Sequence, residues 1–235
     1  MDSSEIFLQS YKIRTIVLND FYHYICIYMN TKDKIIQKAL MLFNDRGYTV
    51  VTTRHIAQEL EISPGNLHYH FKHSEEIVSV LLTDLICKTE FLMNSFKSDS
   101  GISIPNLQHY LRSVLELFFD YRFIFINFND VFRDVPELKS KFLEVYSKRK
   151  KQFEEIIREF QHMKIFRENL PLELLESVIA QIFIIADNYI SYNRVINEFE
   201  KSEAVRYYSQ IIMNLFLPLF VEKERTYYLQ NYLSY

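Results

Sequence analysis

Glycine is the scarcest turn-forming residue of this chain: Gly47, Gly65 and Gly101 are the only three among 235 residues, and the closest two lie eighteen positions apart. Loops that wrap a phosphate or turn sharply behind a nucleophile need closely spaced glycines, because glycine alone tolerates the backbone conformations and close approach involved. A dinucleotide-binding loop, a Walker loop and the nucleophile elbow of α/β hydrolases are therefore excluded. We expect neither an enzyme nor a bound cofactor.

Prolines mark helix boundaries along the chain. Four of the five open an apolar stretch of helical periodicity, where a missing N–H is harmless, and Pro218 closes one. Hydrophobic residues make up 49% of the chain, which is enough for a buried core, and no long stretch alternates as a β-strand does. We predict an all-α protein of about nine helices. The expected helices are 32–46, 53–60, 64–71, 75–97, 105–120, 122–132, 137–163, 171–195 and 202–217, with a tenth candidate over 223–233.

Charge is distributed unevenly between the two halves of this array. Residues 31–74 contain six Lys and Arg against four Asp and Glu, whereas residues 75–235 contain nineteen against twenty-three. A mildly basic module followed by an acidic body permits a polyanionic partner for the module. We predict a helix-turn-helix domain of three helices over 31–76 and a larger helical domain over 77–235.

The N-terminus and the cysteines argue against export. Residues 1–30 lack the basic start of a signal peptide and form an arm that is either a functional extension or the result of a misassigned start codon. Cys26 and Cys87 lie sixty-one residues apart, too far for a zinc knuckle or a disulfide framework, which favours a reducing cytoplasm. The longest apolar run, 215–221, contains Pro218 and falls short of the ~20 residues of a membrane span. We expect a soluble cytoplasmic protein without a membrane partner.

Two short helices joined by a tight turn are predicted within the basic module. Thr52 is a good N-cap for the first, and Ser63 caps the second with Pro64 at its first helical position. On the second helix Leu67 and Phe71 are spaced i, i+4 and must face the core. The residues left facing outward are Pro64, Gly65, Asn66, His68, Tyr69 and His70. Small residues at the helix start allow close approach to a major groove, where amide and imidazole groups reach base edges.

This segment resembles the DNA-binding domain of the TetR (tetracycline repressor) family of bacterial regulators. The family pattern T-T-R-x-I-A-x-x-L-G-V-S-x-G-x-L-Y-x-H-F-x-x-K-E-E is matched from Thr52 onward by TTRHIAQELEISPGNLHYHFKHSEE. The resemblance implies double-stranded DNA as a partner, regulation of transcription, and DNA contacts grouped on one face. The residues implied are Thr52, Thr53, Arg54, Pro64, Gly65, Asn66, His68, Tyr69, His70 and Lys72.

Three positions depart from the family pattern. Glu61 replaces the turn glycine, His68 replaces a tyrosine, and Ser74 replaces a lysine. The first implies a non-glycine residue in a left-handed conformation at a cost of about 1 kcal/mol, and the last removes one phosphate contact. Short helix pairs also occur in bundles that never meet DNA. The alternative is therefore a helical ligand-binding or scaffold protein with a vestigial helix-turn-helix.

Two long helices near the C-terminus are too apolar for one-sided burial. The predicted helices 171–195 and 202–217 carry apolar residues around most of their circumference, so they must be covered on two sides. A two-fold partner most simply covers the second side, which predicts a homodimer and an operator that is an inverted repeat. The predicted interface residues are Phe183, Ile190, Ile212 and Phe216.

Aromatic residues crowd the segment 115–132, and two interpretations stay open. One is plain aromatic core; the other is that part of this set, with polar residues of helix 171–195, lines a pocket for a small apolar or aromatic effector. The candidate pocket residues are Phe118, Tyr121, Phe125, Phe128, Gln181 and Asp187. A carboxylate such as Asp187 in an apolar helix needs a partner. By the resemblance, an effector repositions the helix 75–97 and releases a repressor from its operator, with a coupling of ~1–3 kcal/mol.

Histidines cluster in the basic module without forming a metal-ligand pattern. Four of the seven, His55, His68, His70 and His73, fall within nineteen residues. His68 and His70 point about 200° apart on a helix and neither has a histidine at i+4, so one ion cannot collect them. We expect no metal.

A basic run interrupts the acidic body at Lys148–Lys151. Glu154 and Glu155 follow it, so i, i+4 ion pairs on the solvated face of a long helix are expected. The alternative interpretation is a supplementary patch for nucleic acid or a membrane surface.

Overall fold

The computed structural model describes residues 30–98 and 102–232, so the predicted arm lies, except for Asn30, outside the described residues. These two ranges are all-α, as predicted, apart from one isolated β-bridge between Phe166 and Phe220. Their helices are α2 (Thr31–Arg46), α3 (Thr53–Glu59), α4 (Pro64–His70), α5 (Ser74–Ser98), α6 (Ile104–Asp120), α7 (Arg122–Ile126), α8 (Phe128–Asp134), α9 (Pro136–His162), α10 (Leu172–Ile196), α11 (Lys201–Asn214) and α12 (Glu222–Tyr232).

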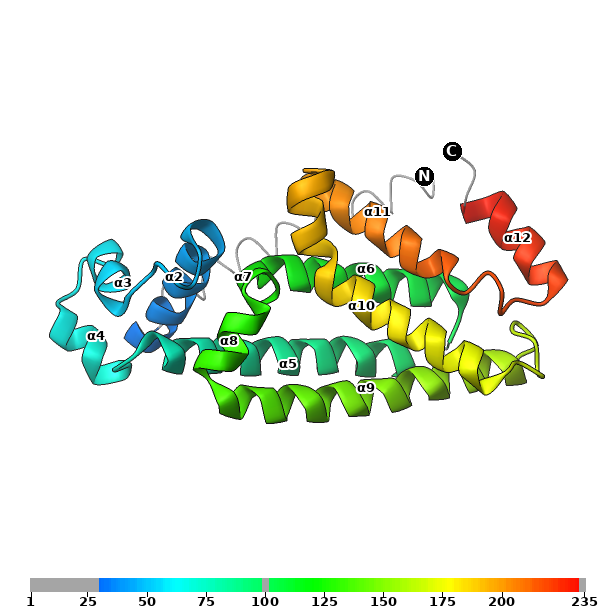
Figure 1. The fold of residues 1–235 in the computed structure, drawn as a ribbon, viewed down its shortest axis with the longest axis horizontal. Coiled ribbons are helices and arrows are strands. Elements are labelled where there is room, and N and C mark those ends of the chain that lie inside the picture. The colour runs from blue at the N-terminus through cyan, green and yellow to red at the C-terminus, as the bar shows by residue number, and fades with distance from the viewer. Residues whose placement is uncertain (1–29, 99–101, 233–235) are drawn as a thin grey trace, which may run out of the picture.

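The molecule is elongated, with a small domain of α2, α3 and α4 at one end and a larger helical body at the other (Figure 1). Helix α5 starts under the small domain and runs along the body, where α9 lies beside it. Helix α6 packs on both α5 and α11, and α10 crosses the body beside α7 and α11. The last helix, α12, closes the far end.

Short-range capping explains where the helices of the small domain begin and end. The Asn30 side chain accepts from the Asp33 N–H at 3.0 Å, and the Ser63 hydroxyl accepts from the Asn66 N–H at 3.1 Å. Thr52 and His55 form a reciprocal capping box at the start of α3. Gly47 ends α2 with a φ of 90°, a conformation in which a side chain would be strained.

The core of the small domain is built partly from α5. Ile35 and Phe43 of α2, Ile56 of α3 and Leu67 of α4 are fully buried, and Ile77 at the start of α5 is buried with them. One continuous apolar cluster extends from there into the body. Because α5 contributes to both cores, any rotation of α5 must carry the small domain with it.

The turn between α3 and α4 contains the predicted strained residue. Glu61 has a φ of 54°, in the left-handed region where the family pattern has glycine. Its N–H donates to the Gln58 carbonyl and the next N–H, that of Ile62, donates to the Ala57 carbonyl, both at 3.1 Å. These bonds retain the turn despite the cost of a side chain in this conformation, about 1 kcal/mol.

The prediction of a single helix over 122–132 is wrong. The range 122–132 consists of two short helices, α7 and α8, which meet at Asn127. The Phe123 carbonyl accepts two hydrogen bonds from Asn127, one from the side-chain amide at 2.8 Å and one from the backbone N–H at 3.0 Å. A side-chain amide that bonds to the neighbouring backbone competes with continued helix, and the periodicity of the flanking phenylalanines masks this break.

Among the described residues, α10 is the one helix long and apolar enough to cross a membrane by length and composition. Eight of its residues are buried within the fold, including Ile182, Phe183 and Tyr189. The Tyr189 hydroxyl donates to the Leu115 carbonyl of α6 at 2.5 Å. A core helix of a helical bundle passes the same test, so its composition is weak evidence for a membrane span.

Candidate nucleic-acid interface and effector cavity

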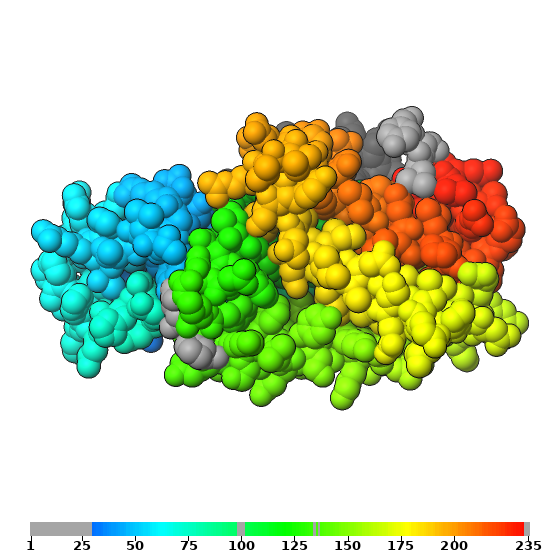
Figure 2. All heavy atoms as spheres, in the orientation of Figure 1, coloured from blue at the N-terminus to red at the C-terminus, as the bar shows by residue number. Residues whose placement is uncertain are grey.

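Helix α4 lies at the tip of the small domain with one face in contact with the core and the other in solvent (Figure 2). Leu67 is fully buried and Phe71 nearly so, as the i, i+4 spacing predicts. Pro64, Gly65, Asn66 and His68 are exposed. The Tyr69 side chain is 84% exposed, the highest fraction among the exposed large hydrophobic residues of the described chain. This face is free of fixed charge and small at its N-terminal end, which suits close approach to a groove.

The remaining residues of the predicted DNA-binding face lie around α4. Thr52, Arg54 and Lys72 are exposed, whereas Thr53 and His70 are half-buried. His68 Nε2 lies 3.5 Å from the Thr53 hydroxyl, and so joins α4 to the start of α3. The structure thus brings all ten predicted residues to one end of the molecule. Among the described residues, no group of three or more His, Cys, Asp and Glu side chains is arranged to hold a metal ion.

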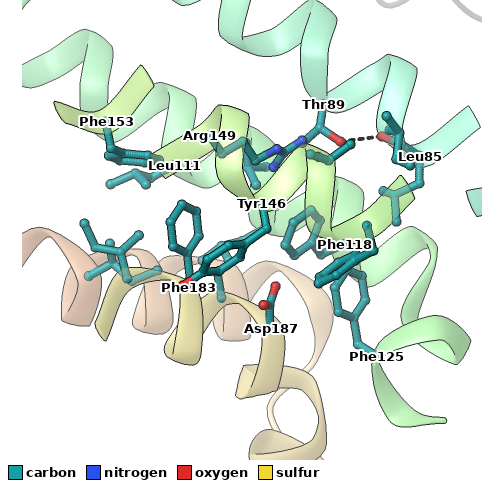
Figure 3. A pocket seen from close by; sticks show the side chains of 18 of the residues that line it. Leu85, Thr89, Leu111, Phe118, Phe125, Tyr146, Arg149, Phe153, Phe183 and Asp187 are labelled. Atoms are coloured by element: carbon teal, nitrogen blue, oxygen red, sulfur yellow. Dashed lines mark hydrogen bonds between the residues drawn. The ribbon is translucent and has the colours of Figure 1, made fainter. Parts of the chain in front are cut away.

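A second feature, an apolar cavity, lies inside the body between α5, α6, α9 and α10 (Figure 3). Its open volume is about 60 Å³. Of the predicted pocket residues, Phe118, Phe125 and Asp187 line this cavity, and the Phe118 and Phe125 rings stack 4.4 Å apart. The aromatic lining also includes Tyr110, Phe142, Tyr146, Phe153 and Phe183.

Three predicted pocket residues lie elsewhere. Gln181 is exposed on α10, where its amide donates to the carbonyl and hydroxyl of Ser177 at 3.2 and 3.0 Å. Tyr121 is buried at the corner between α6 and α7, where its hydroxyl donates to Asp84 and accepts from Lys88 Nζ at 2.7 Å. Phe128 is on α8 and lines a neighbouring surface hollow. Neither proximity in sequence, for Tyr121 and Phe128, nor polarity within an apolar helix, for Gln181, fixes the face of a helix that a residue occupies.

Arg149 is the charged cavity residue that the sequence pattern did not reveal. The run Lys148–Lys151 was interpreted as a solvated face, and Lys148 and Lys150 do form ion pairs with Glu90 and Glu176. Arg149 turns inward instead and lines the cavity (Figure 3). Its spacing from Phe142, Tyr146 and Phe153 repeats every three or four residues, and this periodicity was the available signal.

Burial perturbs both charged groups of the cavity. Burial raises the pKa of Asp187 to about 7, and the Arg149 charge partly opposes this rise. Burial lowers the pKa of Arg149, against the attraction of Tyr110 and Asp187. No ion pair within 4.0 Å joins the two side chains. The cavity therefore contains opposite charges that are near enough to interact but not in contact.

The raised pKa of Asp187 predicts a loss of folding stability with rising pH, and the substitution Asp187→Asn should remove that loss. A carboxyl with a folded pKa of about 7 and an ordinary value of 3.8 binds more protons when folded, so its contribution to stability falls as the pH rises from about 4 to about 7. The free energy of unfolding of the parent should fall relative to that of Asp187→Asn across this window. Urea denaturation of both proteins at a series of pH values measures the difference, and parallel curves would contradict the assignment.

The predicted dimer residues require a correction. Phe183, Ile190, Ile212 and Phe216 are all buried within one protomer, where they pack against the body's own helices. The large apolar residues that α10 leaves exposed are Leu172 at its start and, further along, Ile184, Tyr192, Val195 and Ile196. Phe183 and Ile190 recur with helical periodicity on α10 as the exposed residues do, so periodicity alone could not decide which set faces the protomer's own core.

Together, an exposed helix-turn-helix and a larger helical body with an internal cavity define a class of protein, the DNA-binding regulators of transcription. Comparison with known families identifies the particular one. Residues 35–81 match the family model described as "Bacterial regulatory proteins, tetR family", and residues 90–228 match the one described as "Bacterial transcriptional repressor". The second match alone covers more than half of the chain, so the chain belongs to the TetR family.

Individual relatives agree with this assignment. The chain is 29% identical to the HTH-type transcriptional regulator QacR of Staphylococcus aureus over 135 residues, which are 50% of this chain and 68% of QacR. It is 38% identical to the HTH-type transcriptional repressor KstR2 of Mycolicibacterium smegmatis over 55 residues, which are 23% of this chain and 27% of KstR2. A TetR-family regulator from Marinobacter aquaeolei shares the fold, with a TM-score of 0.78, 24% identity, and coverage of 86% of this chain and 97% of that one. The chain is a DNA-binding transcriptional regulator, and repression is the activity that the family description gives.

Proposed function

We propose that this protein is a cytoplasmic repressor that binds an inverted-repeat operator as a homodimer and releases it when a small apolar or aromatic effector occupies the cavity. The observation that carries the proposal is the outward face of α4, where small and uncharged residues stand beside the exposed Tyr69. Such a helix can lie against base edges while the exposed cations Arg54 and Lys72 approach phosphates.

The exposed stripe of α10 supports the dimer. Ile184, Tyr192 and Val195 are between 56% and 74% exposed and recur on one side of the helix, with Ile196 beside them. An exposed apolar stripe of this kind on a folded surface marks a protein interface, and a second copy offers a matching stripe by two-fold symmetry. The operator half-sites then lie in successive major grooves.

Helix α7 connects the cavity to the small domain. Phe125 of α7 lines the cavity, whereas Phe123 of the same helix packs on Phe43 of α2 with ring centroids 5.2 Å apart. The Asn44 side chain of α2 donates to the Asp120 carbonyl at 2.7 Å and accepts from the Phe123 N–H at 3.0 Å. An effector that moves α7 therefore acts directly on the end of α2.

Removing the Asn44 amide should uncouple the two domains. Asn44→Ala loses both hydrogen bonds to the α6–α7 corner, which should lower the free energy of unfolding by about 1–3 kcal/mol. A compound that releases the parent from its operator should release this variant much less. Urea denaturation and fluorescence anisotropy of a labelled operator measure the two effects, with the exposed neighbour Asp45→Ala as the control. An undiminished response in Asn44→Ala would show that the coupling runs elsewhere.

Selection of genomic fragments by the purified protein tests the proposed function as a whole. We expect enrichment of fragments that contain an inverted repeat, with affinity that falls steeply as salt rises because phosphate contacts release counterions. Failure to retain any fragment, or weak binding that is insensitive to salt, would favour a helical ligand-binding protein whose helix-turn-helix is vestigial.

A further inference from the structure

The cavity contains one cationic and one anionic side chain that do not satisfy each other. Arg149 comes from α9 and Asp187 from α10, and Figure 3 shows their polar atoms on different walls among the labelled aromatic rings. Their charges interact but form no ion pair within 4.0 Å. No hydrogen bond joins either side chain to another residue in the parts of the chain that the structure describes.

The lining has three further polar side chains, Thr89, Tyr110 and Tyr146, of which Thr89 is already committed. The Thr89 hydroxyl donates to the Leu85 carbonyl within its own helix (Figure 3). Buried charges are costly unless they are paired and hydrogen-bonded. Arg149 and Asp187 are half-buried and their unpaired polar atoms remain accessible from the cavity, so a bound molecule that excludes water must supply their partners.

The opposite charges of Arg149 and Asp187 determine which polar group the bound molecule should carry. Arg149 donates only, and Asp187, once it is ionised above its pKa of about 7, accepts only. A hydroxyl or a primary amide meets both, because it accepts from the guanidinium and donates to the carboxylate. A ligand that carries a full charge would pair with one of the two groups and leave the other without compensation once water is excluded.

The volume of the cavity defines the shape of the rest of the molecule. About 60 Å³ is room for little more than a polar head, well below the ~300 Å³ or more of typical small-molecule sites. A second hollow of about 370 Å³ lies at the surface between α8 and α9, lined by Phe128, Phe132 and Phe142. Phe142 lines both spaces, and so separates them. Its half-buried ring contacts the Phe128 and Phe132 rings at 5.2 and 5.1 Å.

We propose that the effector is a neutral, elongated apolar molecule whose hydroxyl or amide lies between Arg149 and Asp187 and whose tail passes Phe142 into the hollow between α8 and α9. This inference rests on the proposed effector-controlled function. Displacing the Phe142 ring joins the two spaces into one site of ordinary size. The aromatic rings then cover the tail, and the two charged groups hold the head.

Three octyl compounds of equal chain length test the head group. Isothermal titration calorimetry of the full chain at about pH 8.5, where Asp187 is ionised, should show 1-octanol binding at least tenfold more tightly than either octanoate or octylammonium. Asp187→Asn leaves a net positive charge, so the preference should shift at least tenfold toward octanoate. Arg149→Met should shift it as far toward octylammonium, with Arg149→Gln as the substitute should the methionine variant not fold. Lys148→Met, at the adjacent position that pairs outward with Glu90, should keep the parent's order.

Chain length tests the tail. Phe142→Ala should bind 1-dodecanol at least tenfold more tightly than the parent does, whereas 1-butanol, which fits beside the head, should bind both proteins alike. A parent that prefers a charged octyl compound, or binds none of the three, would overturn the inference, as would charge variants that keep the parent's order. An equal gain for butanol and dodecanol would overturn the assigned role of Phe142.

Operator binding by the same preparations separates this inference from the proposed function. Retained genomic fragments with no ordered binding of the octyl series would refute the inference and leave the repressor function standing. The expected order of octyl binding without any retained fragment would support the site and refute DNA binding.

Discussion

Replacing Asn66 by alanine is expected to reduce strongly the preference for operator over unrelated duplex, because a dimer loses the Asn66 contact in both half-sites. A side-chain amide that contacts a base edge contributes about 1–3 kcal/mol of discrimination, so two half-sites lose about 2–6 kcal/mol. Asn66 is exposed near the start of α4, and its own N–H is already bonded to the Ser63 hydroxyl, so the side chain remains available. Operator affinity should fall toward the affinity for unrelated duplex, which itself should change little.

The neighbouring substitution Tyr69→Ala should behave differently. Tyr69 can reach a phosphate with its hydroxyl, so its loss should weaken binding to operator and unrelated duplex alike. Fluorescence anisotropy on both duplexes distinguishes the two patterns. Met41→Ala, which is equally a surface change but lies on α2, is the control and should match the parent. If Asn66→Ala and Tyr69→Ala both bound as the parent does, another face of the protein would have to contact DNA.

Val195→Glu is expected to separate the dimer into monomers. Val195 is 74% exposed on the apolar stripe of α10, and two-fold symmetry places a charge from each protomer in the same interface. An uncompensated charge in an apolar interface costs several kcal/mol, enough to raise the dissociation constant of the dimer more than a hundredfold. Operator affinity should fall with it, since each half-site is then bound alone.

Sedimentation velocity of the parent and of Val195→Glu measures this directly. Phe91→Glu provides a matched control, because Phe91 is 69% exposed but lies on α5, away from the stripe. The control should sediment as the parent does. A Val195→Glu protein that remains dimeric would place the interface on another surface.

Local signals in the sequence predicted the small domain well. Caps at Thr52 and Ser63, the glycine at the end of α2 and the strained Glu61 depend on nearest neighbours, and the structure confirms each of them. The outward face of α4 followed from the inward spacing of Leu67 and Phe71. Its role in DNA binding stays a prediction for the variants above to test.

The body was harder to predict because its helices are apolar on more than one side. Sequence periodicity identified α10 as a helix but could not tell Phe183, which packs inward, from Ile184, which is exposed. Arg149 was hidden in a basic run whose other members do face solvent. These assignments depend on which neighbouring helix covers which side, and that depends on tertiary packing rather than on local pattern.

The length of α5 has a mechanical consequence. At about 1.5 Å per residue its 25 residues form a rod of about 37 Å, with one end built into the small domain and the remainder along the cavity. A tilt of only about 5° about its far end moves the other end by about 3 Å, close to the ~3.4 Å step between successive base pairs. The α5 residues that line the cavity, Leu82 to Thr89, move by only about 1–2 Å in the same tilt, so a shift of that size around a bound molecule is enough to misalign both recognition helices at once.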